Sequence, residues 1–275
     1  MPTTVPGTTL GSPAGLDAPT DGVRAGPLVA TLVARDTIAP GIVDLAFAMR
    51  SPDRLVFRAG QFVSIGVGKD TAGTSMRRSY SIASPTGSGD RLRFIIRAIA
   101  AGAASEFLLS LPMGAEVRMT GPHGFFVLDA EHPGDIVFGA TGTGVAAVMP
   151  MLVELAQRDQ RGSPAERGRR LLFWGVRHQA DLFAVAEIEA LCRQARCALT
   201  IFLSGQSLAP APAPAAGWTS ARGRITPAIL DELPQLVSPT FYLVGNGAMI
   251  AELKAALIAR GVNRKKQIRT EAFFD

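Results

Sequence analysis

The chain has 275 residues, of which 47% are hydrophobic and 19% charged, and its formal net charge is +5. This composition is typical of a globular chain, and the length favours two domains, each with its own core. Two cysteines and three scattered histidines exclude a disulfide framework, an iron–sulfur cluster and a metal site, and no block of lysine and arginine predicts nucleic-acid binding. The low cysteine content fits a reducing cytoplasm, where we expect the protein.

Residues 1–26 are rich in proline, glycine, threonine and alanine and predict a disordered tail. No basic start followed by an apolar run is present, so we expect no secretory signal. The charge-free stretch 136–153 approaches the length of about 18 residues that suggests a membrane span. Its glycines, threonines and Pro150 favour a strand, a tight loop and a helix start instead, so we expect no membrane insertion.

Residues 27–132 contain short hydrophobic runs separated by turns, and these predict a domain of six strands with one helix at 105–111. Six short antiparallel strands with one helix are typical of a small closed barrel. The turn at 121–125 leaves this barrel, and we expect Phe125 in its core. The expected strands are 28–34, 43–48, 61–67, 78–83, 92–98 and 116–120.

The fourth expected strand begins with Arg78-Ser79-Tyr80-Ser81. Side chains alternate along a strand, so Arg78 and Tyr80 share one face and Ser81 opens toward the other. A guanidinium suits a pyrophosphate, and an aromatic ring suits stacking on a flat heterocycle. These residues predict either a flavin dinucleotide site or an ordinary amphipathic strand with one surface arginine.

Gly102-Ala103-Ala104-Ser105 follows the fifth expected strand and opens the predicted helix. The N–H groups at a helix start attract phosphate, so this segment is a candidate cofactor contact together with Arg78. Ser105 is alternatively an N-cap that needs no ligand. Arg97, on the preceding strand, would add charge near the adenylate end of the cofactor.

From Asp135 the pattern changes to strands alternating with helices, so residues 133–275 predict a second domain. We expect a doubly wound parallel five-stranded sheet, which binds ligands at the carboxyl ends of its strands. The Ala/Pro-rich stretch 209–217 predicts an inserted loop. The expected strands are 136–140, 171–175, 199–203, 241–244 and 267–270, and the expected helices are 146–158, 184–194, 227–233 and 248–260.

Thr141-Gly142-Thr143-Gly144 directly follows the first strand of this domain and, with Ala147, satisfies the pattern G-x-G-x-x-G/A. The acidic residue usual at the end of the second strand is absent, because Gly175-Val176-Arg177 stands there. The loop alone therefore does not complete a dinucleotide fingerprint. No lysine follows the glycines, which argues against a nucleotide triphosphate loop.

The order of these motifs, from about Pro27 to the C-terminus, resembles the ferredoxin–NADP⁺ reductase superfamily. Arg78-Ser79-Tyr80-Ser81 is similar to its flavin signature, and the family carries a similar Gly-Thr-Gly loop while recognising the ribose elsewhere. The resemblance implies an FAD-binding barrel followed by an NAD(P)-binding domain. It also implies hydride transfer from NAD(P)H to FAD and single-electron transfer to a separate ferredoxin, flavodoxin or oxygenase component.

The same resemblance implies cofactor contacts at the ends of the later strands. NADPH-dependent relatives often place an arginine after the serine that corresponds to Ser204. No arginine follows Ser204 here, which slightly favours NADH as the cofactor. Arg222 and Arg224 offer alternative contacts to a 2′-phosphate, so NADPH stays open. Val244 stands where many relatives have cysteine. The contacts implied in this domain, besides the Gly-Thr-Gly loop, are Arg177, Ser204, Arg222, Arg224, Gly245, Asn246, Met249 and Phe273.

The segment 270–275 is open to two interpretations. Phe273 and Phe274 are core anchors, or, by the resemblance, Phe273 covers the flavin face opposite Tyr80 and Glu271 lies near the reacting nitrogen. On the second interpretation Ser81, Glu271 and Phe273 are the catalytic residues. Alternative activities are reduction of free flavin, ferric chelates or quinones, and an FAD-bound electron-transfer subunit of a larger complex. We expect a monomer.

Overall fold

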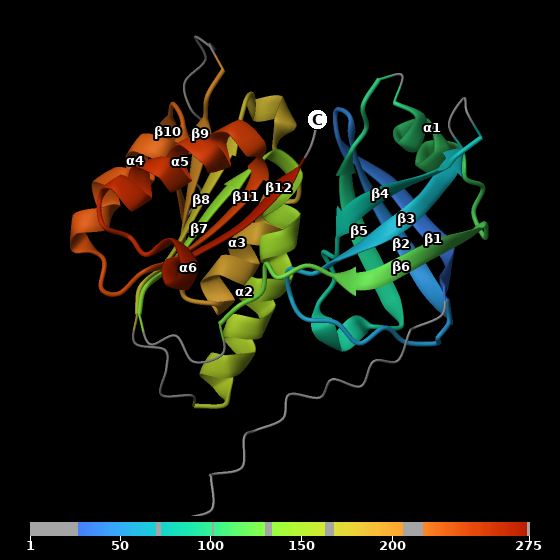
Figure 1. The fold of residues 1–275 in the computed structure, drawn as a ribbon, viewed down its shortest axis with the longest axis horizontal. Coiled ribbons are helices and arrows are strands. Elements are labelled where there is room, and N and C mark those ends of the chain that lie inside the picture. Colours follow the sequence, from blue (N-terminus) through green and yellow to red (C-terminus); the bar gives the residue numbers. More distant parts are fainter. Residues whose placement is uncertain are drawn as a thin grey trace, which may run out of the picture.

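A computed structural model of the protein describes residues 27–69, 73–100, 102–129, 134–162, 168–205 and 217–273. An antiparallel barrel and a parallel sheet flanked by helices lie side by side (Figure 1). The predicted N-terminal tail, most of the predicted loop at 209–217 and Phe274 lie outside the described residues.

The first domain contains six antiparallel strands in the order β4-β3-β6-β1-β2-β5, as expected. Alternate residues such as Leu45, Ile65 and Phe94 point inward and form its buried core. The two ends of the sheet meet just after β4, where the Ala83 N–H donates to the Arg93 carbonyl oxygen at 2.8 Å. The elements are β1 Leu28–Ala39, β2 Ile42–Ser51, β3 Phe62–Lys69, β4 Ser75–Ser81, η1 Thr86–Ser88, β5 Arg91–Arg97, α1 Ala103–Ser110 and β6 Glu116–His123.

The expected place of Phe125 in this core is wrong. The side chain is 94% exposed, whereas the next residue, Phe126, is buried. Strand β6 continues through His123, into the segment expected as a turn, and Gly124 follows with a φ of +101°. This backbone conformation changes the direction of the chain, so the inward position falls to Phe126 instead of Phe125.

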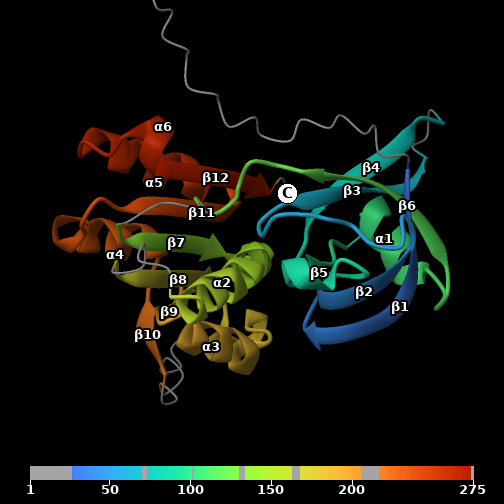
Figure 2. The same cartoon turned by 90° about the horizontal axis from the view of Figure 1, so that it is seen from below.

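The second domain contains a parallel sheet in the order β10-β9-β8-β7-β11-β12. Helices α2 and α3 pack in one hydrophobic cluster, and α4 and α5 pack in another on the opposite face of the sheet (Figure 2). The doubly wound arrangement is therefore confirmed. The strands are β7 Ile136–Thr141, β8 Arg170–Val176, β9 Cys197–Leu203, β10 Trp218–Arg222, β11 Thr240–Asn246 and β12 Ile268–Phe273. The helices are η2 Gly142–Gly144, α2 Val145–Gln160, η3 Gln179–Asp181, α3 Val185–Gln194, α4 Ile225–Glu232, η4 Leu233–Gln235, α5 Gly247–Ala259 and α6 Arg264–Gln267.

This sheet has six strands, one more than expected. The additional strand, β10, lies at the edge of the sheet and pairs with β9 alone. Trp218 is buried, but Thr219, Ser220 and Arg222 interrupt any hydrophobic run. An edge strand of this composition carries no periodic signal that separates it from a loop.

A shared hydrophobic cluster joins the two domains. Ala59, Ala83 and Ile95 of the barrel belong to the same buried cluster as Met151 on α2. Gly60 allows this close approach, because a Cβ there would lie 2.3 Å from the Met151 methyl carbon. The domain interface therefore contains a cluster of apolar side chains that excludes water from this contact.

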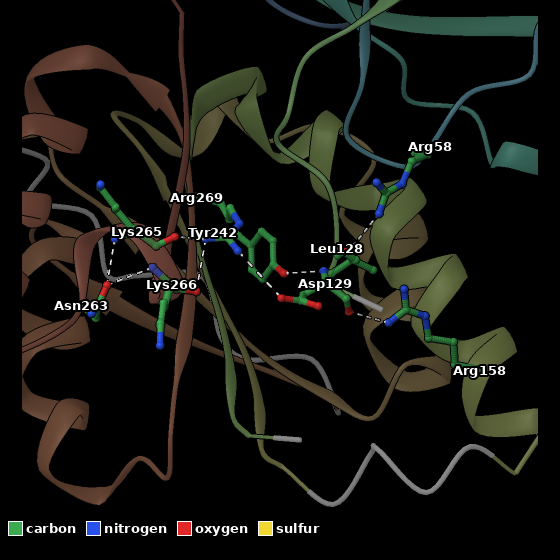
Figure 3. A network of polar contacts seen from close by, with 9 residues as sticks. All are labelled: Arg58, Leu128, Asp129, Arg158, Tyr242, Asn263, Lys265, Lys266 and Arg269. Carbon is green, nitrogen blue, oxygen red and sulfur yellow. Dashed lines mark hydrogen bonds and ion pairs between the residues drawn. The ribbon is translucent and has the colours of Figure 1, made fainter. Parts of the chain in front are cut away.

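Polar contacts hold the chain where it passes between the domains (Figure 3). The Asp129 N–H donates to the Tyr242 hydroxyl at 2.9 Å, and the Asp129 carbonyl oxygen accepts from Arg158 Nη1 at 3.0 Å. Arg58 Nη2 donates to the Leu128 carbonyl oxygen at 3.1 Å. Arg269 Nη2 also lies 3.8 Å from Asp129 Oδ2. One barrel residue and three residues of the second domain thus hold the same two residues of the linker.

The described residues contain neither a candidate membrane span nor a candidate metal site. No helix among them is long and apolar enough to cross a membrane. They also contain no group of three or more histidine, cysteine, aspartate or glutamate side chains that is arranged to hold a metal ion.

Candidate active site

Ser81 and Glu271, both candidate catalytic residues, meet across the domain boundary. Ser81 is the last residue of β4, and its Oγ donates to Glu271 Oε1 at 2.7 Å. Glu271 lies on β12, in register with Val244 on β11. Burial raises the pKa of Glu271 to about 7, and the hydrogen bond from Ser81 opposes part of that rise. This carboxyl can therefore hold or release a proton near neutral pH.

Tyr80 and Arg78 lie on the same face of β4, as the alternation of side chains predicts. Burial raises the pKa of Tyr80 to about 12, and the nearby Arg78 charge acts in the opposite direction. The phenol is therefore neutral at physiological pH. Arg78 is exposed and donates from Nη1 to the Arg77 carbonyl oxygen at 2.9 Å. Ser79, between them, is also exposed.

The start of α1 differs from the expected one. The N-cap is Gly102, and Ser105 instead accepts the Ile99 N–H on its Oγ at 2.9 Å, which closes the loop before the helix. The N-cap interpretation of Ser105 is therefore wrong. No side chain caps this helix start among the described residues, so the N–H groups of Ala103 and Ala104 have no side-chain acceptor there.

The barrel residues fit a flavin dinucleotide. Helix α1 packs against β3, the strand that pairs with β4, so an uncapped helix start and the exposed Arg78 guanidinium belong to neighbouring elements. Both are donors suited to phosphate. Tyr80 offers a neutral, partly buried aromatic face, and Ser81 offers a hydroxyl beside it. Arg97, the other predicted contact, lies 3.4 Å from Asp181 of the second domain through its Nη2.

The Gly-Thr-Gly loop forms η2 at the carboxyl end of β7. Gly142 has a φ of +54°, and no other group lies within 4 Å of the position that a Cβ would occupy. The Trp174 indole, on the neighbouring strand β8, donates to the Gly142 carbonyl oxygen at 2.9 Å and holds the loop in place. Thr143 is half-buried beside it. An open, fixed backbone of this kind suits a close approach by phosphate.

The loop after β11 is in close contact with the Gly-Thr-Gly loop. A Cβ on Gly245 would lie 2.4 Å from Thr141 Oγ1, and one on Gly144 would lie 3.0 Å from the Val244 carbonyl oxygen. Thr141 Oγ1 accepts the Asn246 N–H at 2.8 Å. The two loops predicted to contact the nicotinamide nucleotide are therefore brought together by the adjacent strands β7 and β11.

The other residues predicted near the nicotinamide differ in how far their side chains are buried. Phe273 ends β12 in register with Asn246 and is half-buried against the cluster shared by the domains. Asn246 caps α5 by accepting the Met249 N–H at 3.0 Å. The Met249 side chain is buried in the cluster on the other face of the sheet, and Val244 is fully buried.

The four candidates for the adenosine end lie at the carboxyl edge of the second sheet. Arg177 and Ser204 follow β8 and β9, and both are exposed. Arg222 ends β10 and is exposed as well. Arg224 is the N-cap residue of α4 and forms an ion pair with Glu252 on α5.

Phe62 and Gly124 also lie beside the Ser81–Glu271 pair, although neither is among the predicted site residues. A Cβ on Gly124 would lie 3.5 Å from Glu271 Oε2 and 3.0 Å from a Phe62 ring carbon. The Gln61 side-chain amide donates to the Gly124 carbonyl oxygen at 3.3 Å and joins the two segments. These positions are far apart along the chain, so only the fold brings them to the site.

Known proteins resemble both halves of the chain. Residues 29–128 match the oxidoreductase FAD-binding domain family, and residues 138–255 match the oxidoreductase NAD-binding domain family. Ferredoxin–NADP reductase B of Sorangium cellulosum is 29% identical over 248 residues, which are 87% of this chain and 93% of that protein. Methane monooxygenase component C of Methylosinus trichosporium is 34% identical over 170 residues, 60% of this chain but 47% of that protein.

Solved structures share the fold. A ferredoxin NADP⁺ reductase from Neisseria gonorrhoeae with bound FAD and NADP superposes with a TM-score of 0.68 at 20% identity, covering 90% of this chain and 98% of that one. The Amycolatopsis cytochrome P450 reductase GcoB gives a TM-score of 0.71 at 24% identity, covering 90% and 70%. The resemblance seen in the motifs is confirmed. With an FAD-binding domain followed by an NAD-binding domain in this fold, the chain belongs to the ferredoxin–NADP⁺ reductase-like oxidoreductases.

Proposed function

We propose that this oxidoreductase takes hydride from NADH onto FAD and passes the electrons singly to a separate ferredoxin, flavodoxin or oxygenase component. The Ser81–Glu271 contact is the observation on which the proposal depends. It joins β4, the strand with the residues proposed to contact FAD and hereafter the flavin strand, to β12, the last described strand of the other domain. The names of the relatives, a ferredoxin–NADP reductase and a monooxygenase component, support this class of acceptor. FAD, when bound, supplies the conversion of a two-electron hydride into single electrons.

The protein's own residues would bind the two cofactors and orient them relative to each other. Arg78 and the start of α1 hold phosphate oxygens, and Tyr80 presents a flat apolar surface. Ser81 offers a hydroxyl at the end of that surface, already oriented by Glu271. Glu271 holds a proton at its carboxyl, and its pKa of about 7 allows that proton to be taken up or released at neutral pH. Phe273 covers the site from the β12 side and must tilt to admit a nicotinamide ring.

The preference for NADH rests on the adenosine edge. Residue 205, after Ser204, is glycine, and a Cβ there would lie 2.5 Å from the Arg177 carbonyl oxygen, so a side chain at this position would clash. Arg224 is engaged with Glu252 and would have to break that ion pair to reach a 2′-phosphate. Both observations disfavour a dedicated 2′-phosphate site of the kind found in NADPH-dependent relatives.

An absorbance titration tests the proposal. We expect the purified protein to be yellow, NADH to bleach the visible flavin band, and NADPH to do so with weaker apparent affinity. A colourless protein that takes up no added FAD would contradict it. Steady-state NADH oxidation with and without an added ferredoxin then identifies the acceptor. Turnover of free flavin, ferric chelate or quinone that ferredoxin does not increase would favour direct reduction of small molecules.

A further inference from the structure

Arg93, in the middle of β5, binds acidic side chains in both domains. Its Nε donates to Asp44 Oδ2 at 2.8 Å, within the barrel. Its Nη1 and Nη2 donate to the two carboxylate oxygens of Glu187 on α3, at 2.5 and 3.0 Å. The guanidinium therefore forms a two-point contact with the second domain while a carboxylate of its own domain holds it.

The backbone of Arg93 connects it to the flavin strand. Its carbonyl oxygen accepts the Ala83 N–H at 2.8 Å, and its own N–H donates to Ser84 Oγ at 3.3 Å. Residues 83 and 84 directly follow the strand that ends at Ser81. Strand β5 also contacts η2, the Gly-Thr-Gly loop. The residue that binds Glu187 is therefore joined through its backbone to the segment that follows Tyr80 and Ser81.

The outward face of β5 is directed at the second domain from Arg93 to Arg97. Arg93, Ile95 and Arg97 alternate with Leu92, Phe94 and Ile96, which fill the barrel core. Ile95 belongs to the cluster shared by the domains, and Arg97 reaches Asp181 at 3.4 Å. The apolar contact of Ile95 is non-directional and alone allows the domains to slide. The polar contacts of Arg93 and Arg97, on either side of Ile95, restrict that sliding because they are directional.

We propose that Arg93 is a positioning residue, which orients the NAD(P)-binding domain against the flavin strand through its contact with Glu187. This rests on the proposed function, because hydride transfer requires the reacting atoms to approach within about 3–3.5 Å and makes orientation decisive. Arg93 itself touches neither cofactor in this role. Its carboxylate partner Glu187 is 43% exposed, so the contact adjusts the orientation rather than holding the domains together.

The test is Glu187→Gln, which leaves the Arg93–Asp44 contact inside the barrel intact. In rapid mixing at saturating NADH we expect the limiting rate of flavin bleaching to fall about two- to fivefold, the range for a partly exposed ion pair. FAD content and the apparent Kd for NADH should not change. Glu189→Gln is the matched control, because Glu189 is on the same helix and pairs with Arg193 of that helix. It should bleach at the wild-type rate.

A second measurement is independent of the reaction. Hydrogen–deuterium exchange of the whole protein should be faster in Glu187→Gln than in wild type for peptides covering 83–93 and 141–145, and unchanged in Glu189→Gln.

A double variant tests whether Arg93 and Glu187 act as a unit. Flavin bleaching in Arg93→Lys/Glu187→Gln should be no slower than in the slower of the two single variants, since the effects of residues that act as a unit are not additive. Wild-type rate and exchange in Glu187→Gln, or an equal loss in Glu189→Gln, would overturn the proposal. If NADH does not bleach the wild type, the proposed function fails, and the exchange comparison alone decides on Arg93.

Discussion

The carboxyl group of Glu271 is ionised at very different pH values in the folded and unfolded chain. Burial raises its pKa to about 7, against an ordinary value of 4.5. Between these two values the folded protein holds a proton that the unfolded chain has released. The stability that this proton contributes is present below about pH 4.5 and is lost as the pH rises through 7.

Replacing Glu271 with glutamine removes this pH dependence. From pH 4.5 to pH 8 we expect the free energy of unfolding of the wild type to fall by about 1–2 kcal/mol more than that of Glu271→Gln, allowing for partial exposure of the carboxyl. Denaturant unfolding at the two pH values measures the difference. Parallel pH profiles for the two proteins would mean that folding does not raise the pKa of Glu271.

Arg78 is expected to be needed for flavin retention. Arg78→Ala removes one charge-assisted contact to phosphate, of about 1.5–3 kcal/mol, so the Kd for FAD should rise by roughly one to two decades. Flavin fluorescence titration of the FAD-free protein measures the Kd. Arg118→Ala, an exposed arginine on β6, serves as control and should bind FAD normally. Unchanged flavin content in Arg78→Ala would exclude the phosphate contact.

At the scale of elements, the loops after β7 and β11 form one unit because their backbones touch. Gly245→Ala would place a Cβ 2.4 Å from Thr141 Oγ1 at a φ of +115°, whereas Gly142→Ala meets open space at a φ of +54°. We expect Gly245→Ala to lower the free energy of unfolding by about 2–4 kcal/mol and Gly142→Ala by about 1–2 kcal/mol. Denaturant unfolding of both variants compares them. Equal losses would show that backbone conformation, and not the close approach, sets the cost.

Most elements could be predicted from the sequence, because hydrophobic alternation and the glycine loop are local signals. The alternation along β4 placed Arg78 and Tyr80 together, and the resemblance named both Ser81 and Glu271 as catalytic residues, although not their mutual hydrogen bond. Strand β10 was missed because an edge strand with three polar residues has no hydrophobic run. The Arg93–Glu187 contact joins residues 94 positions apart, and no local pattern predicts which charged surface residues will meet.

For the whole molecule, the formal charge of +5 bears on the proposed acceptor. Figure 1 shows the two domains side by side, with the end of β12 between them, so an acceptor that docks over this junction meets both domains. If the acceptor is an acidic protein, long-range attraction raises its association rate, and salt screens that attraction. Small neutral acceptors experience no such force.

We therefore expect the second-order rate constant for reduction of an acidic ferredoxin to fall about tenfold when ionic strength rises from about 0.01 M to about 0.15 M. Over that interval the Debye length shrinks from about 30 Å to about 8 Å, so only charges close to the contact remain effective. Reduction of a neutral quinone, measured in the same buffers, is the control and should change little. If both acceptors respond equally to salt, the dependence lies in NADH binding or hydride transfer, and electrostatic steering of the partner is excluded.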